Sequence, residues 1–181
     1  MVSEGMLLFL SKDGILEHMK YAENTRLQIS ILEKSYPEIC GKSFVEVMKC
    51  KIPRQHKIEL QERKVECLSH ELYFKSFAVN DKPCREIRKY FPSENSFCYE
   101  VLEMAKRHKN GFLYVFRDEP RGVKMLHSSD RRIPFLNYVP GLCLDLEEHS
   151  YFADYGFRRE DYLRSAIAHL DLSLLFVDEK G

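Results

Sequence analysis

Two long helix-forming stretches in the N-terminal half constrain the fold more than any other feature of this sequence. The first starts at Ser11 or Asp13, both of which can cap a helix, and it runs to about Ser35. Residues recur at helical spacing along one face of it: Ile15, His18, Met19, Ala22, Arg26, Ile29 and Leu32. A largely apolar face of this kind needs a partner to cover it.

The partner is a second helix, expected from about Gln55 to Phe77. The intervening chain contains the breakers Pro37 and Gly41, and a short helix starts there at Ser43. Two long helices joined by such a kinked return are expected to run antiparallel as a helical hairpin.

The second half of the chain mixes helices with strands. Helices are expected at 85–90, 93–109 and 159–170, and strands at 111–118, 123–129 and 139–146. The segment "EPRG" is typical of the turn between the first two strands. We therefore predict an α+β fold, with a helical hairpin domain over 1–80 and a domain over 81–181 that contains a three-stranded antiparallel sheet and surrounding helices.

Composition argues against several classes of partner. Lys+Arg and Asp+Glu number 28 each, so the formal net charge is zero, whereas proteins that bind nucleic acid or anionic membranes carry a basic excess. The apolar run 6–10 is too short for a signal-peptide core, and no stretch reaches transmembrane length. The six cysteines form no C-x-x-C pair, which predicts reduced thiols and a cytoplasmic protein.

Two of the seven histidines lie on helix faces that we expect to be buried. Four other histidines lie in polar or boundary contexts that are typical of surface or capping roles: His56, His108, His127 and His169. His18 lies on the apolar face of the first helix, and His70 lies midway along the second, in "ECLSHELYF". Each alone is typical of a core histidine, but antiparallel helices bring the two to facing positions.

A strand end adds a carboxylate and a third imidazole. In "GLCLDLEEHSYFADYGFRREDYL", Asp145 follows a buried strand directly and His149 comes four residues later. Three imidazoles and one carboxylate suit Fe, Mn or Zn, whereas Mg and Ca prefer all-oxygen ligands. These residues predict a metal site between the hairpin and the sheet.

These motifs resemble the iron/manganese superoxide dismutase family from about residue 10 to residue 175. "PGLCLDLEEHSYFADYGFRREDYL" resembles the C-terminal signature, in which an aspartate, two residues, a glutamate and a histidine precede aromatics. "ECLSHELYF" resembles the central helix, "LSKDGILEH" the start of the first helix, "GKSFVEVM" the short helix and "NGFLYVF" the first strand.

The resemblance implies a superoxide dismutase that converts superoxide to dioxygen and hydrogen peroxide. It implies one Fe or Mn ion, with a bound solvent, held by four residues: His18, His70, Asp145 and His149. It also implies a homodimer, in which Glu148 reaches His149 of the partner subunit. Arg159 matches an arginine that lines the family's substrate funnel.

Several residues around the expected site depart from the family pattern. Four and eight residues after His18 the family has histidine and tyrosine, but this chain has Ala22 and Arg26. One helical turn before the second ligand the iron branch has glutamine, and this chain has Glu66, which when ionised can only accept hydrogen bonds or pair with Arg26. Glu147 replaces a tryptophan, and the chain contains no tryptophan at all.

The residues expected to act in catalysis are Glu66, Arg26, Arg159 and Tyr73, with Glu147 and Glu148 beside the site or at the dimer contact. Arg26 cannot donate a proton near neutral pH, but it can attract an anion such as superoxide. A surface position for Arg26 and a solvated position for Glu147 are the alternatives.

Three functions are compatible with this sequence. The first is a divergent superoxide dismutase. The second is another redox reaction at the same Fe or Mn ion, such as dioxygen-dependent oxidation of a small molecule, because the altered residues would widen and polarise the pocket. The third is a non-catalytic structural module, but a purely structural role would not require the four ligand residues that this chain has.

Overall fold

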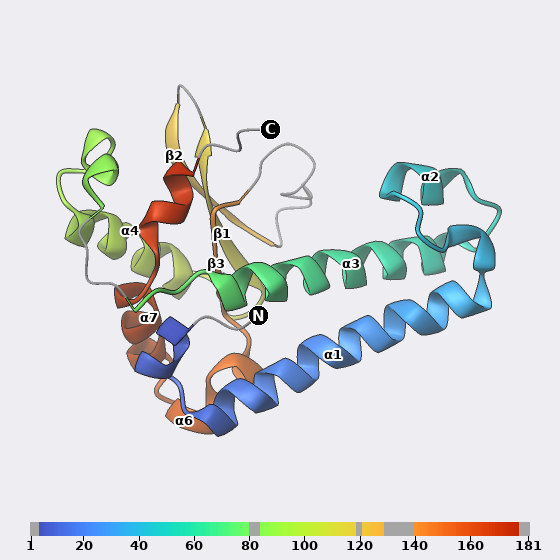
Figure 1. Cartoon of the computed structure of the whole chain (residues 1–181), viewed down its shortest axis with the longest axis horizontal. Helices are drawn as coiled ribbons and strands as arrows, with labels where there is room; N and C mark the ends of the chain where they lie inside the picture. The colour runs from blue at the N-terminus through green and yellow to red at the C-terminus, as the bar shows by residue number, and fades with distance from the viewer. Residues whose placement is uncertain (1–3, 80–83, 119–120, 129–139, 178–181) are drawn as a thin grey trace.

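The computed structural model describes residues 4–79, 84–118, 121–128 and 140–177 (Figure 1). Its α-helices are α1 (Lys12–Ser35), α2 (Phe44–Lys49), α3 (Arg54–Lys75), α4 (Glu94–Lys106), α6 (Phe152–Tyr155) and α7 (Arg159–Ala168). Its strands are β1 (Phe112–Asp118), β2 (Gly122–His127) and β3 (Leu142–Asp145). Short 3-10 helices are η1 (Glu4–Leu8), η2 (Pro37–Ile39), η3 (Arg85–Lys89), η4 (Glu148–Ser150) and η5 (Leu172–Phe176). None of the helices described is long and apolar enough to cross a membrane.

Helices α1 and α3 lie side by side and run in opposite directions, and α2 lies in the return between them (Figure 1). Helix α1 begins where the Ser11 hydroxyl accepts a hydrogen bond from the Gly14 N–H. Helix α2 begins at a capping box formed by Ser43 and Glu46. We call the end of this hairpin that packs on the sheet its base, and the end that carries α2 its tip.

The inner face of α1 differs slightly from the predicted one. Met19 is 40% exposed, and the side chain of Arg26 is 54% exposed. Helical spacing of three and four residues places another row inside: Ile15, His18, Ala22, Thr25 and Leu32. His18 is therefore enclosed, whereas Arg26 lies at the edge of the helix pair.

Strand β1 is the centre of a three-stranded antiparallel sheet with the order β2-β1-β3. The register places Phe112 opposite Asp145 at one end of the β1–β3 pair. Helix α3 packs against β3, so the end of β3 lies next to the base of the hairpin.

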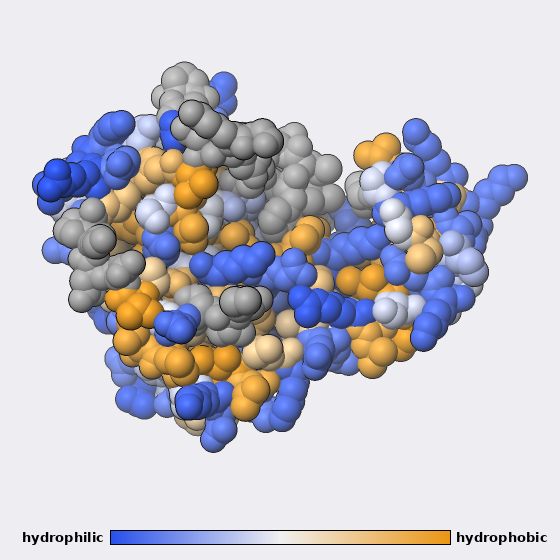
Figure 2. All heavy atoms as spheres, viewed as in Figure 1, coloured by the Kyte–Doolittle hydropathy of each residue, from blue (hydrophilic) through white to orange (hydrophobic). Residues whose placement is uncertain are grey.

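Two apolar clusters hold these elements together. The main core joins the base of the hairpin to the sheet, α4 and α7, and its completely buried members include Tyr73, Phe97, Leu113 and Tyr162. A small separate cluster lies at the tip: Leu32, Ile39, Val47, Ile52 and Leu60. Hydrophilic residues cover much of the hairpin surface in Figure 2, with smaller apolar patches between them.

The predicted α+β fold with its hairpin and three-stranded antiparallel sheet is confirmed. Helices α3 and α7 end slightly before their predicted ends, because Phe77 and Leu170 leave the helices and pair as a β-bridge. Residues 119–120 of the predicted turn, residue 129 of the second strand and residue 139 of the third lie outside the described residues. The division into domains at residue 80 stays a prediction.

Candidate metal centre

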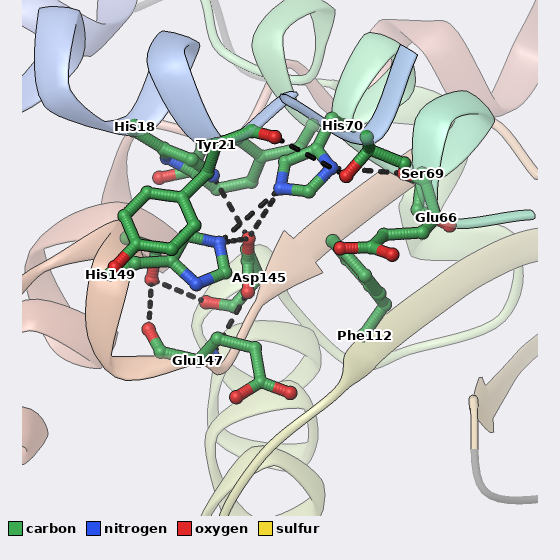
Figure 3. Close-up of polar contacts among 12 residues, drawn as sticks. His18, Tyr21, Glu66, Ser69, His70, Phe112, Asp145, Glu147 and His149 are labelled. Atoms are coloured by element: carbon green, nitrogen blue, oxygen red, sulfur yellow. Dashed lines mark hydrogen bonds and ion pairs between the residues drawn. The ribbon is translucent and has the colours of Figure 1, made fainter. Parts of the chain in front are cut away.

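Four side chains from four separate elements converge where the base of the hairpin meets the sheet (Figure 3). His18 comes from α1, His70 from α3, Asp145 from the end of β3 and His149 from η4. One donor atom from each residue lies within 4.8 Å of the donor atoms of the other three. His18, His70 and Asp145 are almost completely buried, and the His149 side chain is 15% exposed.

A single carboxylate oxygen lies at the centre of this cluster. Asp145 Oδ2 lies 2.9 Å from Nε2 of His18, 3.2 Å from Nε2 of His149 and 3.5 Å from Nε2 of His70. The Nε2 atoms of His70 and His149 are 3.3 Å apart. Adjacent ligands of an ion with bonds of about 2.1 Å are separated by about 3 to 3.5 Å, so these spacings match a coordination shell.

The chain after β3 explains why a buried strand ends on a carboxylate. Asp145 Oδ1 accepts a hydrogen bond from the Glu147 N–H, which turns the chain directly after the strand. The Asp145 carbonyl accepts a hydrogen bond from the Tyr162 hydroxyl at 2.8 Å and another from the Ser150 hydroxyl at 3.2 Å. These bonds fix the backbone so that Oδ2 remains free to point at the three imidazoles.

The hydrogen bonds of His70 make its inward-facing nitrogen an acceptor. Its Nδ1 lies 3.0 Å from the Glu66 carbonyl, which can only accept, so Nδ1 carries the proton. Burial lowers the pKa of His70 to about 4, which keeps the ring neutral at pH 7. The lone pair on Nε2 therefore faces a carboxylate oxygen and a second imidazole.

The charge balance of the cluster favours a cation at its centre. Burial alone would raise the pKa of Asp145, but hydrogen bonds from His149 and His18 outweigh it and hold the pKa well below its usual value. Burial lowers the pKa of His18, although Asp145 opposes this effect. Burial also lowers the pKa of His149, but the hydrogen bond to Asp145 and the charges of Asp145, Glu147 and Glu66 together outweigh burial and raise it. An ionised carboxylate and three imidazole nitrogens form a donor set that fits an Fe or Mn ion, which would displace the protons that His18 and His149 share with Asp145.

Aromatic rings form the wall of the cluster. Tyr73 and Phe74 lie 4.8 Å and 5.0 Å from the His18 ring, measured between centroids. Phe112 meets His70 edge to face at 5.2 Å. This apolar wall limits the access of water to the donors from the core side.

Two of the expected catalytic residues pair elsewhere at the rim. Glu66 forms an ion pair with Arg63 at 3.1 Å, and Figure 3 shows its carboxylate directed toward Phe112. Arg26 forms its ion pair with Glu71 at 3.0 Å. The structure thus does not contain the Arg26–Glu66 pair that the sequence suggested, because each finds a nearer partner.

The two other expected catalytic residues differ in burial, since Tyr73 lies in the core and Arg159 is partly exposed. Tyr73 is completely buried, and its hydroxyl lies 3.2 Å from that of Tyr162. Arg159 donates to the carbonyls of His108 and Ala105, at 2.6 Å and 3.4 Å, at the end of α4. Arg159 therefore ties α7 to α4.

The two glutamates before His149 lie in different environments. Glu147 Oε1 accepts a hydrogen bond from the Gly111 N–H at 2.8 Å, so its carboxylate holds the start of β1. Glu148 is exposed at the first position of η4. Figure 3 shows Glu147 beside the four donors.

Sequence reasoning missed one aromatic residue of the site. The ring of Tyr21 stacks on that of His149, with centroids 4.3 Å apart and an interplanar angle of 15° (Figure 3). Its position three residues after His18, on the neighbouring turn of α1, was the signal that could have identified it.

The fold and the site define an α+β protein with a candidate mononuclear metal centre. Residues 80–175 match the family described as "Iron/manganese superoxide dismutases, C-terminal domain". Because this match covers more than half of the sequence, the chain belongs to the iron/manganese superoxide dismutase family, as the sequence motifs indicated.

One curated relative gives a more limited comparison. A superoxide dismutase (Mn/Fe) of Rickettsia prowazekii (strain Madrid E) is 28% identical over 100 residues. These residues are 54% of this chain and 47% of the relative, so the chain spans about half the length of the curated relative it matches. The family implies a metal cofactor.

Proposed function

We propose that the chain binds one Fe or Mn ion and converts superoxide to dioxygen and hydrogen peroxide. The residues that would hold the ion are His18, His70, Asp145 and His149. The observation that carries the proposal is the convergence of these four donors in a protein of this family. When bound, the ion supplies a reservoir for one electron, so that two superoxide ions and two protons yield one dioxygen and one hydrogen peroxide.

The residues around the donors set charge and geometry at the site. Asp145 gathers the imidazoles, and the Glu66 carbonyl fixes the tautomer of His70. The Glu66 carboxylate acts through charge on His70 and His149, and Glu147 acts through charge on His149. We assign to the Glu66 carboxylate the polar role that a glutamine has in the family pattern.

Assembly and compartment are part of the same proposal. An exposed Glu148 next to His149 supports a homodimer whose contact passes beside the metal centre. All six cysteines lie in the described part of the chain and are free thiols, which supports a reducing compartment such as the cytoplasm.

The decisive experiment measures superoxide decay by stopped flow on iron-loaded and manganese-loaded protein, with metal quantified in the same sample. Decay proportional to bound metal, and lost in His70→Ala, supports the proposal. The matched control is His56→Ala, because His56 also lies on α3 but bonds to the Tyr36 hydroxyl, away from the four donors.

Two negative outcomes have different meanings. Stoichiometric metal without decay above free metal would reject dismutation and favour the second reaction, in which the same ion oxidises a small molecule. A protein that takes up no metal at the four donors, and whose melting temperature does not change with added metal, would favour a structural role.

A further inference from the structure

His149 is the donor with the least support from the protein itself. It lies on η4, a short 3-10 turn, whereas the other three donors lie on long helices or on the sheet. Within the described residues, neither its Nδ1 nor that of His18 makes a hydrogen bond, although metal-binding histidines usually donate this second N–H to a partner. His18, however, is completely buried on the long helix α1, whereas His149 is partly exposed. His70, by contrast, is oriented by its hydrogen bond to the Glu66 carbonyl.

Apart from its Nε2 contacts with Asp145 and His70, the His149 ring is held by stacking on the Tyr21 ring. The two rings are nearly parallel, with centroids 4.3 Å apart, and Tyr21 lies on the outer side of His149 in Figure 3. Tyr21 is 52% exposed while the His149 side chain is only 15% exposed, so Tyr21 takes the solvent-facing position. His18 also contacts the His149 ring, with centroids 5.0 Å apart and an interplanar angle of 69°.

The same turn of α1 thus supplies both a donor and a cover for another donor. Ala22 has no ring that could stack on His149, and Arg26 forms an ion pair with Glu71. The chain also contains no tryptophan that could cover the site. Tyr21 is left as the aromatic residue of α1 that contacts the exposed donor.

We propose that Tyr21 is a positioning residue, whose ring holds the His149 imidazole with Nε2 toward Asp145 and shields it from water. This inference rests on the proposed metal site and names a residue that sets its affinity. The ring face carries the role, because stacking requires the aromatic surface and no hydrogen bond from the Tyr21 hydroxyl to the donors is present in the described structure.

The test compares Tyr21→Ala and Tyr21→Phe, with Leu16→Ala as a matched control at a similarly exposed position of α1, 54% exposed. The first measurement is the rate at which a chelator removes manganese from the loaded protein. We expect Tyr21→Ala to release the ion about 10 to 100 times faster, the range for lost partners of a ligand histidine. Tyr21→Phe and Leu16→Ala should stay within about twofold of the unaltered protein.

The second measurement needs no metal and detects orientation directly. In the metal-free protein, NMR of the His149 ring protons should show the upfield shift of a stacked imidazole, retained in Tyr21→Phe and lost in Tyr21→Ala. Equal rates of metal release from Tyr21→Ala and Leu16→Ala would overturn the inference. So would an equal loss of the upfield shift in Tyr21→Phe and Tyr21→Ala. If the unaltered protein takes up no metal, the proposed function fails, and a His149 signal without the shift would reject the stacking separately.

Discussion

The two ends of the helical hairpin are built from the same pair of helices and differ in what they bury. At the base, α1 and α3 enclose His18 and His70 beside Asp145, and the main core surrounds them. At the tip, the same helices enclose only a small apolar cluster that includes Leu32 and Leu60. The base thus buries side chains that can bind a metal ion, whereas the tip buries apolar side chains that only stabilise the fold.

This difference teaches where binding and folding are coupled. Buried polar groups are unfavourable unless partners satisfy them, and the four donors satisfy one another only in part. His18 Nδ1, for example, has no partner among the described residues. A bound ion should therefore stabilise the base strongly and affect the tip only through the cooperativity of the fold.

The largest effect is expected for Asp145→Asn at the base. Loss of the charge removes the centre on which three imidazoles converge, so we expect no stoichiometric metal binding. At a free metal concentration about a thousandfold above Kd, the unaltered protein gains about 4 kcal/mol of unfolding free energy, and the variant should gain none. Metal analysis and thermal unfolding with and without metal measure both quantities.

The control for that variant is Asp171→Asn, because Asp171 caps η5 far along the chain and contacts none of the donors. Full metal content in Asp145→Asn would contradict the assignment of the centre. Loss of metal in both variants would point to general unfolding instead.

A smaller effect is expected for Leu60→Ala at the tip. Leu60 is 1% exposed within a cluster of few residues, and its truncation should lower the unfolding free energy by about 2 to 4 kcal/mol. Metal affinity should change by less than about twofold, since the donors lie at the other end of the hairpin. Denaturant unfolding and metal titration check this, with the exposed Leu27→Ala as control. A large loss of affinity would mean that the two ends are not independent.

Arg159→Gln should have a moderate effect on stability and none on the metal centre. The guanidinium donates two hydrogen bonds to carbonyls at the end of α4, and their loss should destabilise the protein by about 1.5 kcal/mol. The visible spectrum of the bound metal and the rate of superoxide decay should not change. A decrease in the rate without loss of stability would instead support the funnel role that the family resemblance implied.

Much of the backbone could be predicted because local chemistry fixes it. Ser11 and Ser43 are helix caps that the sequence identifies directly, and the strands follow from runs of aromatic and β-branched residues. The four donors could also be found, since the hairpin brings His18 and His70 together and the family motif marks Asp145 and His149.

The neighbours of the donors could not be predicted, because the partner of a long side chain depends on which residues lie near it in the folded structure. Arg26 reaches Glu71 on the facing helix, whereas the sequence suggested Glu66. Tyr21 contacts a histidine more than a hundred residues away in the chain, and a motif comparison that looks for a tyrosine at the position of Arg26 does not find it. Spacing locates a residue on a face, but it does not show which way a half-exposed side chain turns.

The smallest effect is expected for Arg26→Ala, between base and tip. Both side chains of the Arg26–Glu71 pair are about half exposed, at 54% and 41%, so its loss should change the unfolding free energy by less than about 1 kcal/mol. Because Glu71 already neutralises Arg26, we also expect the rate of superoxide decay to fall by less than about twofold at low salt. Glu71→Gln is the informative partner variant, since it leaves the guanidinium unpaired and should raise the rate, more at low salt than at high salt. A tenfold loss in Arg26→Ala would show that the guanidinium guides the anion despite its ion pair, and the functional region would then extend from the base along the hairpin.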